Sequence, residues 1–295
     1  MILVGLCYYL FTNRSTFDII YDVNYNWIFL VSFGVLCHNL TKTFQLKEYL
    51  ALISKKRLKN FHLFFILISG SLLNYLPLNI GTIFKAKLLK KNMDLSYSYF
   101  VSFSALDAGL KIISSFSLGI LVIPFFWQYL NDNSLIIFSL FFFLIILGII
   151  SFIFLSGIWI PQGRGFISST IKEIILGIRK MTKSLNTFII LYFYTIIQLI
   201  IMSCLFHFAF LSLSAKISFF VSILFSISST ALLLINFTPG NLGIRESFIG
   251  LLSVAMGQNF EIGFIASSVV RIGGMIAHIL FGSIGIFYFK IKKMV

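Results

Sequence analysis

The chain has 295 residues, of which 59% are hydrophobic and 11% are charged, and its formal net charge is +14. Soluble domains carry about 25% charged residues, so this composition excludes an ordinary water-soluble protein. Most basic residues stand in short clusters between apolar runs, which is typical of charge that orients a membrane protein and argues against nucleic-acid binding. We therefore expect one integral membrane domain over residues 1–295 and no nucleic-acid partner.

The apolar runs predict an ordered series of membrane elements, since about 20 apolar residues are needed for each span. The N-terminal run from Met1 to Phe11 is too short to span, and it lacks the basic start of a cleaved signal. The remaining predicted elements, in chain order, are a span at about Asn26 to Phe44, an interrupted stretch from Phe61 to Leu89, a span at Tyr97 to Phe125, a linking helix at 134–160, an amphipathic helix at 166–184, a span at Thr187 to Leu211, a second interrupted stretch from Ile217 to Met256, and a last span at Ile262 to Phe289.

The distribution of basic residues predicts which side of the membrane each connection faces. Four segments, at 42–59, 85–91, 164–183 and 290–293, hold most of the 23 basic residues, and the positive-inside tendency makes them cytoplasmic. The first interrupted stretch then begins and ends inside, and the second begins and ends outside. Both are therefore expected to be re-entrant hairpins that enter from opposite faces. The segment 166–184 is expected to lie on the cytoplasmic surface, with a soluble linker helix as the alternative.

The two interruptions share a pattern of Asn, Pro, Asn and Gly at identical spacing. The first is Asn74-Tyr-Leu-Pro77-Leu-Asn79-Ile-Gly81 and the second is Asn236-Phe-Thr-Pro239-Gly240-Asn241-Leu-Gly243. The pattern divides the chain into repeats at about 26–125 and 187–289, and the linking helix between them inverts the second repeat. We thus predict an all-α, polytopic transmembrane helix bundle with two inverted repeats, each containing a re-entrant broken-helix hairpin.

The composition of the breaks suggests what they do. Proline removes a backbone donor and glycine relaxes the chain, so each motif stops a helix and frees backbone groups. Freed groups cannot face lipid and must be buried in protein or line a hydrated cavity. The four asparagine side chains of the two motifs are candidates to satisfy these groups or to bind a ligand. The alternative is that the breaks are architectural only, with the asparagines as caps.

Two charges lie deep in apolar runs of equivalent helices, Asp107 in the first repeat and Arg271 in the second. A charge at a helix centre costs about 2.5–3.5 kcal/mol on insertion scales, so it tends to face a partner or water. We expect Asp107 and Arg271 to approach each other or to line a polar cavity jointly, with a structural ion pair as an equal alternative. Lys111, one turn after Asp107, is spaced to pair with it. His278 lies seven residues after Arg271, on the same predicted helical face.

Further charges follow the breaks directly. Arg245 and Glu246 stand at the start of a short predicted helix, where Arg245 is well placed for a phosphate and Glu246 suits the helix dipole. Lys85 either mirrors Arg245 in the first hairpin or anchors the chain at the cytoplasmic surface. The sequence contains no nucleotide-binding loop, metal-binding helix, nucleophile elbow or Cys/His cluster. We therefore predict no catalytic residue, no metal, no cofactor and no enzymatic activity.

These motifs give the chain a family resemblance. It resembles the flippase-like transmembrane domain of lysylphosphatidylglycerol synthases, as a free-standing member, over about residues 27–289. The resemblance is carried by Leu76-Pro77 through Gly81, by Lys85 to Leu89, by Asp107, by Thr238 to Glu246, and by Arg271. Asn79 and Thr82 depart from a stretch that is often richer in glycine and acidic residues. The soluble aminoacyl-transferring domain of the full synthases is missing from this sequence.

The resemblance implies a multi-pass protein of the inner membrane of a bacterium or archaeon. It implies translocation, or assisted translocation, of a polar-headed lipid such as a phospholipid or a lipid-linked sugar. We then expect the cations Arg245, Arg271 and Lys85 to bind the phosphate of that lipid. Other polar groups of the head are expected to meet Asp107, Glu246, Asn74, Asn79, Asn236 and Asn241. Membrane lipids are the expected partners, with an envelope glycosyltransferase or a further copy of the chain as additional candidates. Two alternatives stay open: a non-transporting scaffold or regulator of an envelope glycosyltransferase, and a membrane-embedded enzyme acting on a lipid-linked sugar.

Overall fold

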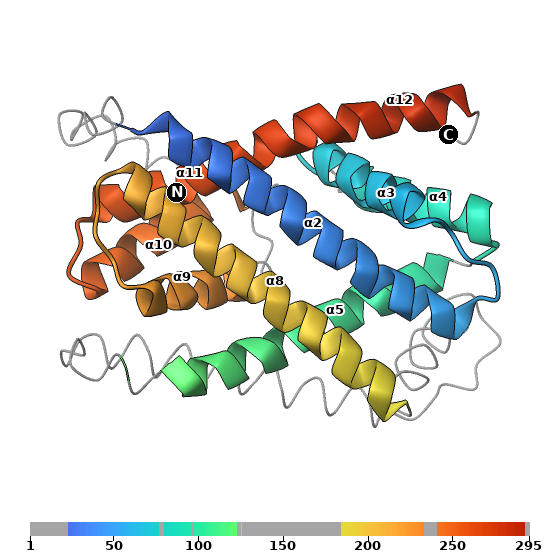
Figure 1. Ribbon diagram of the computed structural model, residues 1–295, viewed down its shortest axis with the longest axis horizontal. Coiled ribbons are helices and arrows are strands. Elements are labelled where there is room, and N and C mark those ends of the chain that lie inside the picture. Colours follow the sequence, from blue (N-terminus) through green and yellow to red (C-terminus); the bar gives the residue numbers. More distant parts are fainter. Residues whose placement is uncertain are drawn as a thin grey trace. The chain divides into compact units, whose positions relative to one another are not determined.

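The computed structural model describes residues 23–76, 80–95, 97–122, 125, 184–232 and 241–292, and the elements it describes are helices (Figure 1). The prediction of an all-α chain is confirmed within these residues. The helices are α2 (Tyr25–Ile53), α3 (Asn60–Leu73), α4 (Ile80–Met93), α5 (Tyr97–Val122), α8 (Leu185–Ser212), α9 (Phe219–Leu232), α10 (Ile244–Ala255), α11 (Phe260–Ala277), a π-helical turn η6 (His278–Gly282) and α12 (Ser283–Ile291). The predicted linking helix 134–160, the N-terminal run 1–11 and all but the last residue of the amphipathic segment 166–184 lie outside the described residues.

Three helices in the described part of the chain are long and apolar enough to cross a membrane. They are Tyr97–Val122, Leu185–Ser212 and Phe260–Ile291, the last of which comprises α11, η6 and α12. Each coincides with a span predicted from the sequence.

Helix α2 differs from the prediction in two ways. It is not among the three apolar helices, because polar residues such as His38, Asn39 and Lys42 interrupt its apolar run. It also continues to Ile53, since the residues after Phe44 are mostly good helix formers. Lys42 therefore lies within a helix and not in a basic connection after it.

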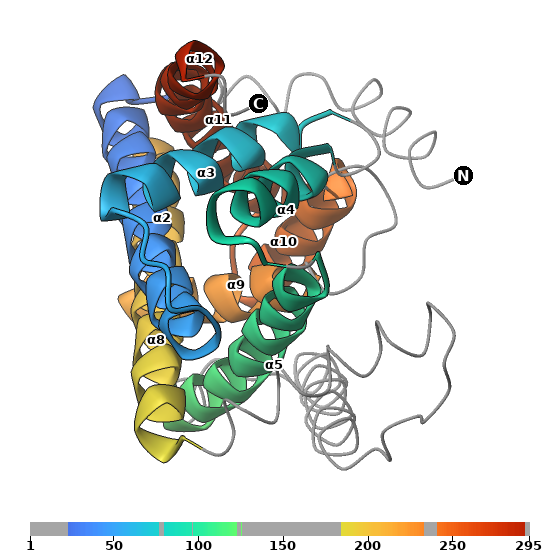
Figure 2. The ribbon, with the colours of Figure 1, turned by 90° about the vertical axis from the view of Figure 1, so that its right-hand side faces the viewer.

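The helix is interrupted in both stretches where the sequence predicts a break. Helix α3 ends at Leu73 and α4 begins at Ile80, while α9 ends at Leu232 and α10 begins at Ile244. Helices α3 and α4 pack side by side (Figure 2). A side chain at Gly81 would overlap the carbonyl oxygen of Gly70, so this close approach requires a glycine. Five predicted break residues, Pro77, Asn79, Asn236, Pro239 and Gly240, lie outside the described residues.

The chain divides into two compact units, each of which contains one of the breaks. Unit 1 comprises Met1–His38, Ser117–Phe141 and Leu199–Ala277, and unit 2 comprises Asn39–Phe116, Phe142–Gln198 and His278–Val295. In unit 1, α10 packs against α9 and α11, and Phe210 stacks on Phe225 with ring centroids 4.8 Å apart. In unit 2, α12 packs along α3, and the Ser69 hydroxyl donates a hydrogen bond to the Gly282 carbonyl at 2.9 Å.

Candidate functional site

A buried carboxylate on α5 organises the charged residues of unit 2. Oδ2 of Asp107 accepts hydrogen bonds from Nζ of Lys42 at 3.3 Å and from Nζ of Lys111 at 2.8 Å. The Lys111 contact is the i, i+4 pair that the spacing predicts. The Asp107 side chain is only 8% exposed, and the side chains of Lys42 and Lys111 are 25% and 17% exposed. All three residues belong to helices, Lys42 to α2 and Asp107 and Lys111 to α5.

A third lysine joins this group from α4. Lys85 is buried, its aliphatic chain packs over Gly70, and its charge lies within electrostatic range of Lys42, Lys111 and Asp107. With all four groups ionised, three lysines against one aspartate leave a formal excess of two positive charges. Uncompensated charge is costly in a protein interior or a bilayer. The set Lys42, Lys85, Lys111 and Asp107, called here the lysine cluster, is therefore suited to an anion.

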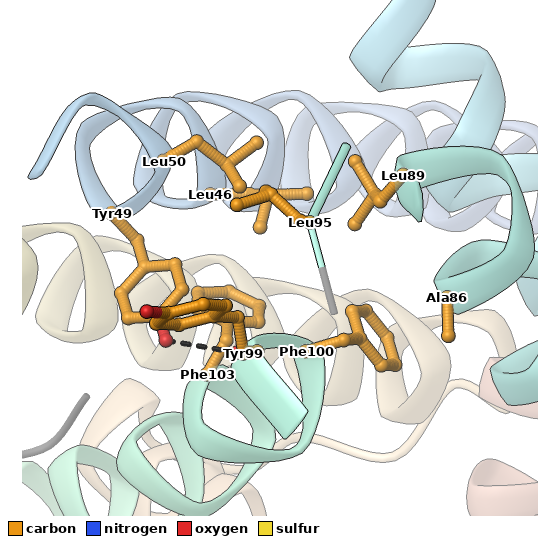
Figure 3. Close-up of a pocket in the computed structure, with 9 residues that line it drawn as sticks. All are labelled: Leu46, Tyr49, Leu50, Ala86, Leu89, Leu95, Tyr99, Phe100 and Phe103. Carbon is orange, nitrogen blue, oxygen red and sulfur yellow. Dashed lines mark hydrogen bonds between the residues drawn. The ribbon is translucent and has the colours of Figure 1, made fainter. Parts of the chain in front are cut away.

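The packing of aromatic residues between α2 and α5 holds the lysine cluster in register. Tyr49 of α2 lies against Phe103 of α5, with ring centroids 5.1 Å apart, and its hydroxyl donates to the Tyr99 carbonyl at 2.8 Å (Figure 3). Phe103 is one turn before Asp107. The cavity that these side chains border has a volume of about 10 Å³, which is room for about one water molecule. It is a packing gap with an apolar lining and cannot hold a lipid head group.

The π-helical turn places a histidine beside the first break. Asn39 Nδ2 donates to Nε2 of His278 at 3.3 Å, and Nδ1 of His278 lies 3.1 Å from the Tyr75 hydroxyl. His278 is also within electrostatic range of Lys85. Single π-helical turns inside α-helices occur frequently at functional sites. His278 is the first residue of this turn and belongs to unit 2, whereas Arg271, seven residues earlier, belongs to unit 1.

In unit 1, the second break is fixed by an ion pair. Nε of Arg271 donates to Oε1 of Glu246 at 2.6 Å, and the backbone N–H of Gly243 donates to Oε2 of Glu246 at 2.8 Å. Glu246 is the third residue of α10, so it caps the helix in the position where a carboxylate complements the dipole. Both carboxylate oxygens are engaged within the protein. This arrangement is that of a structural ion pair.

The neighbouring residues complete the turn before α10. Asn241 has φ +51° and Gly243 has φ +82°. Both are left-handed conformations, and one residue, Leu242, separates them. Nδ2 of Asn241 donates to the Leu232 carbonyl at 2.8 Å, which links the start of α10 to the end of α9. Nη2 of Arg271 donates to the Asn241 carbonyl at 3.3 Å. The Arg245 guanidinium lies over the ring of Phe206, with Cζ 5.6 Å from the ring centroid.

The structure therefore groups the sequence-predicted residues into two sets. Lys85 and Asp107 lie in unit 2, and Asn241, Arg245, Glu246 and Arg271 lie in unit 1. Because Asp107 and Arg271 belong to different units, their approach to each other stays a prediction. Asn74 follows α3, where its backbone N–H donates to the Gly70 carbonyl at 3.1 Å and its Oδ1 lies 3.5 Å from the Thr82 hydroxyl.

Sequence reasoning missed Lys42, Asn39 and Tyr75. Lys42 was grouped with the basic connection, and the only signal against this was a polar series, Asn39, Lys42 and Gln45, recurring every three residues in an apolar helix. Across the described ranges, no group of three or more His, Cys, Asp or Glu residues is positioned to hold a metal ion.

Comparison with known families places the chain among membrane proteins. A family model described as the lysylphosphatidylglycerol synthase TM region matches residues 1–290, which include every candidate residue above. Searches of curated proteins and of solved structures found no match. The match and the three apolar helices establish a multi-pass membrane protein. The chain belongs to the lysylphosphatidylglycerol synthase TM region family.

Proposed function

We propose that this protein moves a polar-headed lipid between the two leaflets of its membrane, or assists that movement. The observation that supports the proposal most strongly is the lysine cluster: Lys42 and Lys111 pair with the buried Asp107, and a third buried lysine, Lys85, lies within electrostatic range of all three. A lipid phosphate supplies the missing negative charge at such a site and forms charge-assisted hydrogen bonds with ammonium groups. The substrate is a phospholipid or a lipid-linked sugar.

The two breaks provide the route in this proposal. The hairpins α3–α4 and α9–α10 enter the bilayer from opposite leaflets, as the inverted sequence repeat and the positive-inside tendency suggest. The freed backbone groups of each hairpin offer hydrogen bonds to the polar head group, since such groups are not tolerated against lipid. The head group passes these groups while its acyl chains stay in the hydrocarbon region.

Individual residues have distinct parts in this mechanism. Lys85 and Lys42 bind the phosphate, and Asp107 keeps the ammonium groups of Lys42 and Lys111 in place. Arg271 and Glu246 hold the second break in shape, and Arg245 offers a further cation to the head group. The asparagines of the two motifs bind other polar atoms of the head group. We place this activity in the inner membrane of a bacterium or archaeon, as the family resemblance implies.

The test is the redistribution of a fluorescent phospholipid in liposomes that contain the purified protein. Lys85→Met matches the lysine chain as far as Cε, which includes the atoms that pack over Gly70, and removes the charged ammonium group. Lys87→Met removes a charge from the exposed face of the same helix and is the matched control. We expect Lys85→Met to slow redistribution about tenfold or more, the equivalent of one lost charge-assisted hydrogen bond, and Lys87→Met to leave it unchanged.

Two outcomes would contradict the proposal. Equal effects of the two substitutions would show that the buried lysine has no special part. Wild-type protein that gives no redistribution would favour a scaffold that recruits or regulates an envelope glycosyltransferase. The assay uses an anionic and a zwitterionic phospholipid probe. We expect faster redistribution of the anionic probe, because the lysine cluster carries excess positive charge.

A further inference from the structure

Unit 2 contains a second cavity, which shares no lining residue with the lysine cluster. It lies where α2 ends, α3 begins and α4 ends, and its volume is about 210 Å³. Its lining includes the cationic side chains of Lys47, Lys56 and Arg57 and the apolar side chains of Leu50, Leu63 and Met93. The cavity belongs to the face that the basic segments mark as cytoplasmic.

The two kinds of lining residue differ in their exposure. Leu50, Leu63 and Met93 are buried and form an apolar base. Lys56 and Arg57 are exposed, and Lys47 is half-buried. The cavity is therefore amphiphilic, with cations at its edge and hydrocarbon within.

The cationic residues differ in how far their charge is already compensated. Lys56 forms an exposed ion pair with Asp94, whereas Lys47 and Arg57 form no ion pair within the residues that the structure describes. Glu48 is the acidic member of the lining. Lys47 and Arg57 are thus available to bind an anionic ligand. The carboxylate of Glu48 disfavours a ligand that carries more than one negative charge.

We propose that this cavity binds the phosphate of an anionic phospholipid from the cytoplasmic leaflet. The Arg57 guanidinium and the Lys47 ammonium match a phosphate by charge, and the planar guanidinium can bind it with two hydrogen bonds. The apolar base accepts the glycerol carbons and the first methylene groups of the acyl chains. Basic pockets beside membrane helices on the cytoplasmic side are suited to anionic head groups. Because the site does not require the lipid to move, it is independent of the translocation proposed above.

The test uses the full-length purified protein in detergent micelles and three probes. These are a short-chain phosphatidylglycerol, a phosphatidylcholine with the same chains, and glycerol 3-phosphate. We expect phosphatidylglycerol to bind more tightly than phosphatidylcholine, whose cationic choline is repelled by the lysine and arginine. Binding of glycerol 3-phosphate as tight as that of phosphatidylglycerol would assign the site to a soluble phosphate ester and overturn the lipid assignment.

Two double variants locate the binding. Lys47→Gln with Arg57→Gln removes two cations from the cavity, and Lys55→Gln with Lys59→Gln removes two exposed cations of the same basic segment that do not line it. The first pair should raise the Kd for phosphatidylglycerol about tenfold or more, and the control pair less than about twofold. Equal weakening by both pairs would reduce the effect to general surface charge and refute the site.

A third variant changes affinity in the opposite direction, which loss of folding cannot imitate. Glu48→Gln removes the carboxylate from the lining and should tighten the binding of phosphatidylglycerol. Unchanged or weaker binding in this variant would also contradict a phosphate in the cavity. Redistribution in liposomes serves as the separate readout: loss of binding at this site with transport intact leaves the proposed function standing.

Discussion

Replacing Glu246 with glutamine removes one charge from a buried ion pair and leaves the shape of the side chain nearly unchanged. In the native protein the carboxylate accepts from Arg271 Nε at 2.6 Å and from the Gly243 N–H at 2.8 Å. The glutamine oxygen can still cap α10, since Glu and Gln are both found at this position of a capping box. The substitution therefore isolates the charge that faces Arg271.

The expected loss follows from the burial of the two partners. Removing one partner of a buried pair typically costs about 3–5 kcal/mol, because the remaining charge is left uncompensated. The Arg271 side chain is 15% exposed, and its Nη2 keeps the Asn241 carbonyl as an acceptor. Both features place the expected loss at the lower end, about 3 kcal/mol. The measurement is equilibrium unfolding in mixed detergent micelles, followed by circular dichroism.

A double-mutant cycle decides whether this loss belongs to the pair. Arg271→Met alone leaves the Glu246 carboxylate with the hydrogen bond from the Gly243 N–H but without its cation, so it should cost about 2 kcal/mol. The double variant contains no buried charge at this position, and its loss should be smaller than the sum of the single losses by about 2 kcal/mol. Additive losses would refute the structural ion pair. Unchanged stability together with lost lipid redistribution would instead show that Glu246 acts on the substrate.

Three further substitutions test the packing of unit 2 by the same unfolding measurement. Gly81→Val should cost about 1–3 kcal/mol, because the new side chain overlaps the end of α3, whereas Thr82→Val at the exposed neighbouring position should cost less than about 0.5 kcal/mol. Tyr49→Phe should cost about 1 kcal/mol, because it removes the hydroxyl that donates to the Tyr99 carbonyl. Tyr99→Phe is the control and should cost less, because the backbone carbonyl that accepts this bond is kept. Asp107→Asn should cost about 2 kcal/mol, because two partly exposed lysines lose their anion, and a loss below about 0.5 kcal/mol would contradict the cluster.

The interruptions of the helices could be predicted from the sequence because their cause is local. Proline and glycine act on the backbone at their own positions, so the end of α3 and the start of α10 follow from the two motifs. The pairing of Lys111 with Asp107 is local in the same sense, since helical geometry brings residues four apart onto one face. The contact of Glu246 with the Gly243 N–H is also local, because a capping box joins residues three positions apart.

The remaining contacts depend on tertiary packing, which local spacing does not contain. Lys42 and Asp107 are 65 residues apart, and the sequence alone counted Lys42 with the basic segment 42–59, because it lies at the end of the predicted span and is followed by further lysines. The π-helical turn had no sequence signal, and neither did the contacts of His278 with Asn39 and Tyr75, which are 239 and 203 residues away in the chain. Hydropathy could not identify either feature, because it averages over a window and discards the direction of each side chain.

The repeat in the sequence does not make the two breaks chemically equivalent. In unit 2 the lysine cluster has one carboxylate for three cations, so an additional anion lowers its electrostatic energy. In unit 1 the Glu246–Arg271 pair is neutral, and both oxygens of Glu246 are already bound by groups of the protein. A phosphate therefore gains more at the lysine cluster than at the pair. Under the proposed function, the lysine cluster recognises the phosphate of the lipid and the pair holds the start of α10 in shape, a division of roles that the inverted repeat alone would not suggest.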